Sequence, residues 1–497
     1  MFKNVTPESV GVKSEWIENF INHLQEKGIA MHDVLMMRGD KIFCEAYWKP
    51  FNKDFLHRQY SQTKSFVGVA IGLLEEEGKL KLDDKIVDYF KDKIDGEVSE
   101  YMARQTIRDM LTMQTCCVCP SWFSDPDKDR VRLYFNKVKV NREPGTIWDY
   151  DSAGSQVLSS LVERLSGKSM FEYLKEKIFD KIGAFENAYT LKIPTGEDWG
   201  DSAMICTPRD MLAFARFVLN YGTWKGERLM NEKYLKDATS ALAYNNNKIH
   251  TNAHAVGYGY QIWRTTNNCF GFFGLGQQLT ICNPDKDIIF VCNSDVQGAY
   301  YPYDVMINYY FDEVLKKVDS DVLPEDKKAN EKLNKLIDGL ELICAKGSEK
   351  VDIQDEINGK TYLATYTENP TSLYKFKLIF DENGGGELHF ANAQGDKVLP
   401  FKLNKNHFCK FPQLGYWDKV GTVPAGGDFM YDCAVSGAWM SDKRFQLYVQ
   451  IIDKYMANCT FNFEFKDKTI ASVLMTKSAE GFMNEYSNVA ILKLIEE

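Results

Sequence analysis

The sequence predicts an α+β domain followed by a separate antiparallel β domain. Three observations predict this organisation. The chain of 497 residues is too long for a single hydrophobic core. Strand-like runs stand at both ends of the first 318 residues, with helix-periodic runs between them. After about residue 355, short aromatic and β-branched runs alternate with glycine-rich turns such as Asn383–Gly386.

The strands of the first domain are predicted from short apolar runs on either side of turn residues. Gly39-Asp40 has the composition of a tight hairpin turn, and Asn283–Lys286 forms a second turn. The predicted strands are residues 33–37, 41–48, 279–282 and 288–292. We therefore expect one hairpin at each end of this domain.

The helices between these hairpins are predicted from apolar spacing and from capping residues. Thr106 and Thr207-Pro208 are typical helix starts, and Ser166-Gly167 is a typical stop. The predicted helices run from Ser61 to about Gly78, over 107–113, over 156–165, and onward from Pro208. Together with the two hairpins, they define a domain over residues 1–318.

The residue composition changes after residue 318. Residues 319–354 are rich in charge and helix formers, and we expect them to be a helical connector. Residues 355–497 are expected to form an antiparallel β domain, either a sandwich or a barrel.

Composition excludes several classes of partner. The formal net charge of -10 argues against nucleic-acid binding. No run of apolar residues approaches the roughly 18–20 that a membrane span needs, so no membrane partner is expected.

The N-terminus lacks the apolar core of a signal peptide, and the twelve cysteines show no disulfide framework. Both features predict a cytoplasmic protein, and the cluster Cys116–Cys119 is interpreted as structural.

Ser61 and Lys64 form the most informative pair in the sequence. They open an apolar, helix-periodic run, and residues three apart share one face of a helix. A serine hydroxyl becomes a nucleophile when a neighbouring base takes its proton, and a lysine can be that base. The pattern predicts a nucleophilic serine that works without histidine. His32, His57, His250 and His254 are isolated in the sequence, and no Gly-x-Ser-x-Gly elbow occurs.

The same Ser-x-x-Lys spacing recurs at Ser372 and Lys375. That copy lies in an alternating run, where neighbouring side chains point to opposite faces of a strand. We interpret it as a chance match.

Several ordered segments resemble the serine β-lactamase superfamily, on the branch of class C β-lactamases, esterases and 6-aminohexanoate-dimer hydrolases. The resemblance covers roughly residues 5 to 315. The segments that carry it are Tyr60–Phe66, Leu80–Ile86, Thr106–Met113, Pro144–Gly154 and Thr207–Leu212. It implies an antiparallel sheet flanked by helices, an all-helical subdomain, and no cofactor or metal ion.

The resemblance also implies roles for particular residues. Tyr150 matches the tyrosine that shares proton transfer with the lysine, while Ser152 replaces the asparagine of the family's Tyr-x-Asn motif. A tyrosine keeps its proton to about pH 10 unless cations lie nearby, so Lys64 beside Tyr150 would suit acid–base transfer. Ser152 has a shorter reach than asparagine and could still bind Lys64.

The third motif of the resembling family, Lys-Thr-Gly or His-x-Gly, is matched best by Phe272-Phe273-Gly274. The basic residue is absent, so a substrate carboxylate would lack its usual partner. Arg264 is a candidate replacement. The resemblance implies an oxyanion hole made by the backbone N–H of Ser61 and an N–H near Leu275.

The sequence therefore predicts a serine hydrolase that cleaves a small-molecule ester or amide through an acyl-enzyme. Trp122-Phe123 and Trp148 would add an apolar or aromatic wall to the pocket. Two alternatives stay open. One is a β-lactamase or penicillin-binding D-peptidase, and the other is a non-catalytic protein that keeps the fold and binds a ligand.

Overall fold

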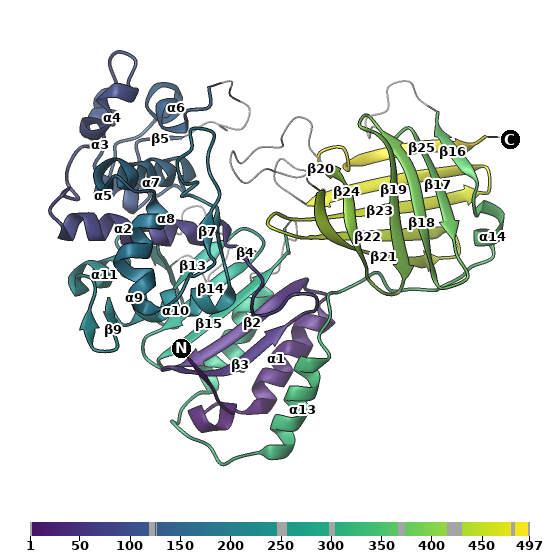
Figure 1. The fold of residues 1–497 in the computed structure, drawn as a ribbon, viewed down its shortest axis with the longest axis horizontal. Coiled ribbons are helices and arrows are strands. Elements are labelled where there is room, and N and C mark those ends of the chain that lie inside the picture. The colour runs from purple at the N-terminus through teal and green to yellow at the C-terminus, as the bar shows by residue number, and fades with distance from the viewer. Residues whose placement is uncertain are drawn as a thin grey trace. The chain divides into compact units, whose positions relative to one another are not determined.

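The computed structural model describes residues 2–118, 125, 127–245, 256–297, 304–365, 373–414, 430–478 and 483–495. The chain divides between Glu341 and Leu342 into two compact units. Figure 1 shows mixed helices and strands in the first unit and almost only strands in the second. No described helix has both the length and the apolar character needed to cross a lipid bilayer.

The first unit is built around an eight-stranded sheet. All neighbouring strands are antiparallel except the parallel pair β1 and β3. In spatial order the strands are β1 (Lys3–Asn4), β3 (Lys41–Tyr47), β2 (Met31–Arg38), β15 (Ile288–Ser294), β14 (Gln278–Asn283), β13 (Cys269–Gly274), β12 (Trp263–Thr265) and β11 (Gly257–Tyr258). The two predicted hairpins are present, and β2 pairs with β15 to join them into one sheet.

Helices cover both faces of this sheet. Phe20 of α1 packs against Phe290 of β15 on one face, and Phe214 of α10 packs against Phe272 of β13 on the other. The helices are α1 (Ser14–Glu26), α2 (Thr63–Glu76), α3 (Ile86–Tyr89), α4 (Glu100–Arg104), α5 (Ile107–Leu111), α6 (Arg130–Lys137), α7 (Ser152–Ser166), α8 (Met170–Leu174), α9 (Asp180–Ile182), α10 (Pro208–Leu219), α11 (Glu232–Ala238), α12 (Tyr309–Glu313) and α13 (Lys327–Asp338). Helix α2 packs against α7 and α8, and it carries Lys64.

Short paired strands lie in the segments between these helices. They are β4 (His57–Arg58), β8 (Met204–Cys206) and β7 (Tyr189–Thr190) in one group, β5 (Cys117–Val118) with β6 (Lys139–Val140), and β9 (Thr223–Trp224) with β10 (Glu227–Arg228). The ladder of β4 and β8 holds the residues just before Ser61 against the segment that contains Asp201.

Local sequence signals account for several helix boundaries. Thr106 and Thr207 precede helices, as predicted, and the structure shows that each forms a capping box with an aspartate three residues later. Helix α7 ends at Gly167, whose φ of 72° suits glycine. It begins earlier than predicted, because the Asp151 side chain accepts the Gly154 N–H and caps the helix there.

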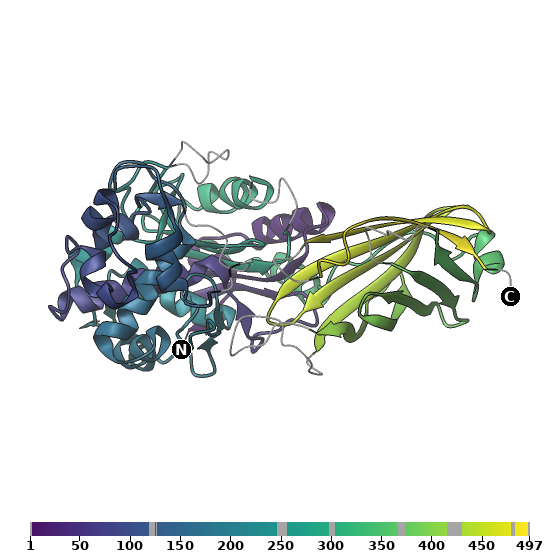
Figure 2. The same ribbon diagram turned by 90° about the horizontal axis from the view of Figure 1, so that it is seen from above.

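The second unit is a closed β-barrel. Its ten-stranded sheet has β19 paired both to β18 and to β21, so the sheet closes on itself, and the barrel alternative of the prediction is confirmed. In order the strands are β19 (Gly395–Leu403), β18 (Gly385–Asn392), β17 (Lys375–Phe380), β16 (Thr361–Ala364), β25 (Asn488–Leu494), β24 (Ile470–Ser478), β23 (Met456–Asp467), β22 (Arg444–Ile452), β21 (Met430–Ser441) and β20 (His407–Leu414). Strands β17–β19 lie in front of β22–β24 in Figure 1, and the turned view in Figure 2 separates the two layers.

The boundary between the units falls inside the segment predicted as a connector. Helix α13 belongs to the first unit and packs against α1. Helix α14 (Ile353–Ile357) belongs to the second unit. Lys375 of the second Ser-x-x-Lys pattern opens strand β17, while Ser372 lies outside the described residues.

Candidate active site

The structure brings Ser61 and Lys64 into direct contact. Ser61 lies in a short 3₁₀ turn, Tyr60–Gln62, that runs into helix α2. The Lys64 Nζ donates to the Ser61 Oγ at 3.0 Å and to the backbone carbonyl of Asp201 at 2.6 Å. The Asp201 carboxylate lies 4.0 Å from the same nitrogen. Lys64 is buried and Ser61 is half-buried, so the hydroxyl is reachable while the amine is held in place.

The turn that presents Ser61 is strained and is supported by a buried cation. Tyr60 has a φ of 46°, in the left-handed region that a bulky residue rarely adopts. The Arg58 guanidinium lies 4.3 Å from the centroid of the Tyr60 ring and donates to the Ser202 carbonyl at 2.9 Å. Arg58 therefore ties the turn of Ser61 to the segment that binds Lys64. Sequence reasoning missed it, because its partner lies 144 positions away.

Tyr150 lies beside the amine of Lys64. The Nζ is 5.0 Å from the centroid of the Tyr150 ring, close enough for a cation–π contact. Trp263 of β12 stacks on Tyr150, with 5.7 Å between the two ring centroids. The structure thus assembles the three predicted residues Ser61, Lys64 and Tyr150.

Aromatic side chains form a wall next to Tyr150. Trp148 lies 6.3 Å from Tyr150 between ring centroids, and Trp263 contacts both Tyr258 and Phe273. Trp148 was expected near the pocket, whereas Trp263 was missed because it lies 113 positions after Tyr150. Residues 122 and 123, the other expected part of this wall, lie outside the described residues.

Ser152 is the first residue of α7. Within the described residues, no hydrogen bond joins its side chain to Lys64. The neighbouring Asp151 is buried, which raises the pKa of its carboxyl, and the Gly154 N–H partly offsets that effect. Ser152 therefore does not hold the lysine.

Phe272 does not take the substrate-binding position that was predicted for it. Its side chain is fully buried in the core against Phe214, so it cannot line a substrate pocket. Side chains alternate along a strand, and Phe273 therefore points to the opposite face, where it meets Trp263. Phe273 is the ring of this motif that contacts the aromatic wall.

The end of β13 lies against the turn of Ser61. Gly274 abuts the Gln59 backbone so closely that only glycine fits. Leu275 follows, and its carbonyl accepts from the Gln278 side chain at 2.8 Å. In the described part of the chain, no hydrogen bond to another protein group uses the backbone N–H of Ser61 or of Leu275. As far as the described residues go, both N–H groups are thus available for the expected oxyanion hole.

Arg264 does not replace the missing cation. Its guanidinium donates to the Thr239 carbonyl at 3.3 Å and to the Asn268 side chain at 2.7 Å. Because it follows Trp263 in the same strand, its side chain leaves the sheet on the face away from Tyr150.

Two histidines that looked isolated in the sequence meet in the structure. His32 Nδ1 and His57 Nε2 are 2.8 Å apart, and both rings are buried. Burial lowers the pKa of His57 to about 3 and lowers that of His32 well below its usual value. Burial therefore favours the neutral form of both rings. Among the described residues, no cluster of three His, Cys, Asp or Glu side chains could hold a metal ion.

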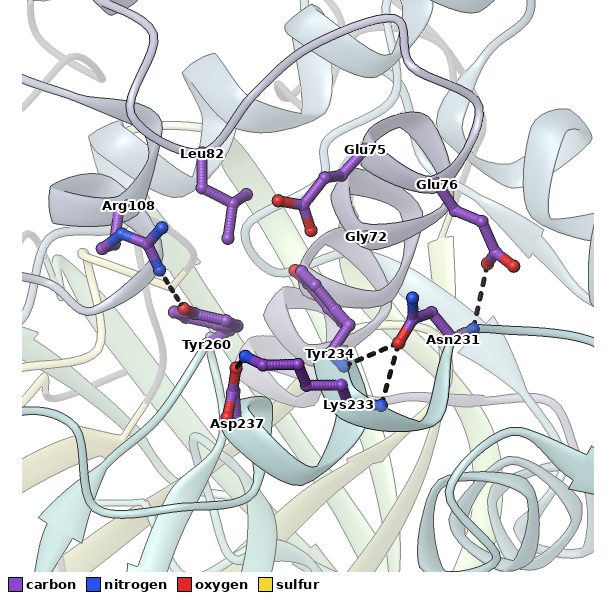
Figure 3. A pocket seen from close by; sticks show the side chains of 10 residues that line it. All are labelled: Gly72, Glu75, Glu76, Leu82, Arg108, Asn231, Lys233, Tyr234, Asp237 and Tyr260. Atoms are coloured by element: carbon purple, nitrogen blue, oxygen red, sulfur yellow. Dashed lines mark hydrogen bonds and ion pairs between the residues drawn. The ribbon is translucent and has the colours of Figure 1, made fainter.

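A separate pocket of about 430 Å³ opens on the opposite end of α2 (Figure 3). Its lining residues are Gly72, Glu75, Glu76, Leu82, Arg108, Asn231, Lys233, Tyr234, Asp237 and Tyr260. Gly72 is eleven positions after Ser61, which corresponds to about 16 Å along a helix. This pocket is therefore distinct from the site of Ser61.

Comparison with known proteins identifies the family of this chain. The family model described as Beta-lactamase matches residues 16–304, and the chain belongs to that family. The 6-aminohexanoate-dimer hydrolase of Paenarthrobacter ureafaciens is 24% identical over 259 residues, which are 49% of this chain and 66% of the relative. A candidate penicillin-binding protein, PbpX of Bacillus subtilis (strain 168), is 23% identical over 172 residues, which are 33% of this chain and 42% of the relative. The chain thus spans no more than about two thirds of these curated relatives.

Two solved structures share the fold of the first unit. A candidate 6-aminohexanoate-dimer hydrolase from Bacillus anthracis has a TM-score of 0.53 and 20% identity, over 65% of this chain and 89% of its own. A candidate beta-lactamase from Bacteroides dorei DSM 17855 has a TM-score of 0.51 and 13% identity, over 62% of this chain and 99% of its own. The chain is therefore a member of a hydrolase family with the β-lactamase fold.

Proposed function

We propose that this protein is a serine hydrolase that cleaves an ester or small amide through an acyl-enzyme on Ser61. The observation that carries the proposal is the 3.0 Å contact between the Ser61 Oγ and the buried Nζ of Lys64. This contact gives the hydroxyl proton a direct path to the amine when the serine attacks. The name of the hydrolase relative from Paenarthrobacter ureafaciens supports the same class of reaction.

In this mechanism the Ser61 oxygen attacks the substrate carbonyl carbon while Lys64 receives the hydroxyl proton. The carbonyl oxygen becomes negatively charged and is held by the backbone N–H groups of Ser61 and Leu275. Tyr150, beside the Lys64 amine, passes a proton to the leaving alcohol or amine. Water then attacks the acyl-enzyme and gives a proton to Tyr150, and Lys64 returns the hydroxyl proton to the Ser61 oxygen as the carboxylic acid leaves.

The surroundings of the site favour a neutral substrate with an apolar or aromatic part. Trp263 is partly exposed and stacks on Tyr150, and the buried rings of Trp148 and Phe273 pack against Trp263. Phe272 stands where the resembling enzymes carry a cation, and Arg264 is held elsewhere by Thr239 and Asn268. A buried substrate carboxylate would thus lack a charged partner from these positions, which is unfavourable.

The test is a comparison of Ser61→Ala with Ser372→Ala, which removes the serine of the second Ser-x-x-Lys pattern. We expect the wild-type protein and Ser372→Ala to hydrolyse p-nitrophenyl butyrate and to react covalently with a fluorophosphonate probe. Ser61→Ala should do neither. Labelling that persists in folded Ser61→Ala would contradict the mechanism. A higher kcat/KM for penicillins than for the ester would favour the β-lactamase alternative.

A further inference from the structure

The barrel holds two cysteines directly opposite each other on paired strands. Cys409 of β20 and Cys433 of β21 are register partners, and their sulfur atoms are 3.6 Å apart. Opposed residues of an antiparallel pair have Cα atoms about 4.5–5.5 Å apart, within the 4.4–6.8 Å range that disulfides span. A bond requires the sulfur atoms to close to about 2.05 Å, which small side-chain rotations supply.

The two thiols differ in access. Cys433 is buried, whereas Cys409 is half-buried, and of the cysteines in the described ranges only Cys344 is similarly exposed. The hydrogen bond between the two thiols lowers the pKa of Cys409 and raises that of Cys433. Cys409 is thus suited to react first with a reagent from solution, and Cys433 is placed to react second.

We propose that Cys409 and Cys433 form an oxidation site, which closes to a disulfide in exchange with a small-molecule disulfide such as oxidised glutathione. The Cys409 thiolate attacks one glutathione sulfur, forms a mixed disulfide and releases one glutathione thiolate. The Cys433 thiolate then attacks the Cys409 sulfur and releases the second glutathione thiolate. The two cysteines lose two protons and two electrons, and the oxidised glutathione becomes two reduced molecules.

The bond would fasten strand β20 to the barrel. Strand β20 stands at the end of the sheet order and has β21 as its ladder partner. The cysteines are 24 positions apart, so the new link would close a loop and restrict the unfolded chain. We therefore expect oxidation to raise the unfolding temperature of the barrel by a few degrees.

The experiment uses the full-length reduced protein, incubated with oxidised glutathione and then alkylated under denaturing conditions. We expect peptide mapping to show the Cys409–Cys433 link, and reduction to reverse it. The matched control Cys344→Ser removes another half-buried thiol and should leave the link intact. In Cys433→Ser, Cys409 should accumulate as the glutathione mixed disulfide.

Three results would overturn the proposal. They are full alkylation of Cys409 and Cys433 in the treated wild-type protein, a mixed disulfide at Cys409 that never resolves in the wild type, and linkage of either cysteine mainly to a different one. The wild-type mapping decides the question even if Cys433→Ser fails to fold. Because the readout is a covalent link in the barrel, it is independent of Ser61 chemistry.

Discussion

Replacing Gly274 by alanine tests whether the end of β13 must lie against the turn that carries Ser61, the proposed nucleophile. A Cβ at position 274 would overlap the backbone carbonyl oxygen of Gln59 and would lie 3.0 Å from the Cβ of Gln278. Neither neighbour is the free end of a flexible side chain. The strand and the turn must therefore separate by roughly half an ångström or more to admit the methyl group.

That separation acts directly on the proposed oxyanion hole. Ser61 follows Gln59 by two residues, and Leu275 follows Gly274, so the two N–H donors would move apart. A misplacement of about 1 Å can cost about 10²-fold in rate, so Gly274→Ala should lower kcat/KM about 10- to 100-fold. This loss corresponds to about 1.4–2.7 kcal/mol of transition-state stabilisation.

The assay is kcat/KM for p-nitrophenyl butyrate, with thermal unfolding measured in parallel. Gly339→Ala is the matched control, because its added Cβ would meet only backbone oxygens at 3.5 Å, an ordinary contact. The control should keep wild-type activity. If folded Gly274→Ala retains more than half of the wild-type kcat/KM, the close approach of β13 to the turn has no catalytic role and the reasoning is refuted.

Two further predictions concern proton transfer and pH. Lys64→Ala and Tyr150→Phe should each lower kcat by about 10²–10⁴. The loss of kcat in the double variant should be far smaller than the product of the two single losses. A loss equal to that product would show that the residues act independently. Burial raises the pKa of Asp33 to about 8, although it accepts hydrogen bonds from Asn293. The folded state therefore holds the Asp33 proton more tightly than the unfolded state does. The contribution of Asp33 to the unfolding free energy is complete below about pH 4, and it falls by about 1.4 kcal/mol per pH unit as the pH rises toward 8. Asp33→Asn should reduce the pH dependence of the unfolding free energy between pH 6 and pH 8, measured by urea titration. An unchanged slope of unfolding free energy against pH would show that another group is responsible.

Local features of the structure could be predicted from the sequence because they depend on neighbours in the chain. Thr106 and Thr207 start helices because each is followed three residues later by an aspartate that completes the capping box. The contact between Ser61 and Lys64 follows from their spacing of three residues, which the 3₁₀ turn that runs into helix α2 keeps on one face. Tyr150 was found from its place in an ordered set of family segments, and the structure places it beside Lys64.

The orientation of the third motif could not be predicted in the same way. Phe272 and Phe273 are adjacent and chemically identical, and a shift of one position exchanges the face that each occupies. The packing of Phe272 against Phe214, 58 positions earlier in the chain, fixes the choice. Local sequence holds no signal for that contact.

The sequence by itself thus determined the class of fold, the helix that carries Lys64, and the pairing of Ser61 with Lys64, while the resemblance to a known family added Tyr150. The tertiary structure alone decided that Arg58 supports the Ser61 turn, that Trp263 stacks on Tyr150, and that Cys409 meets Cys433. The physical reason is the range of the interactions. Caps and helical spacing act over three or four residues, whereas buried contacts between distant segments depend on how the whole chain packs.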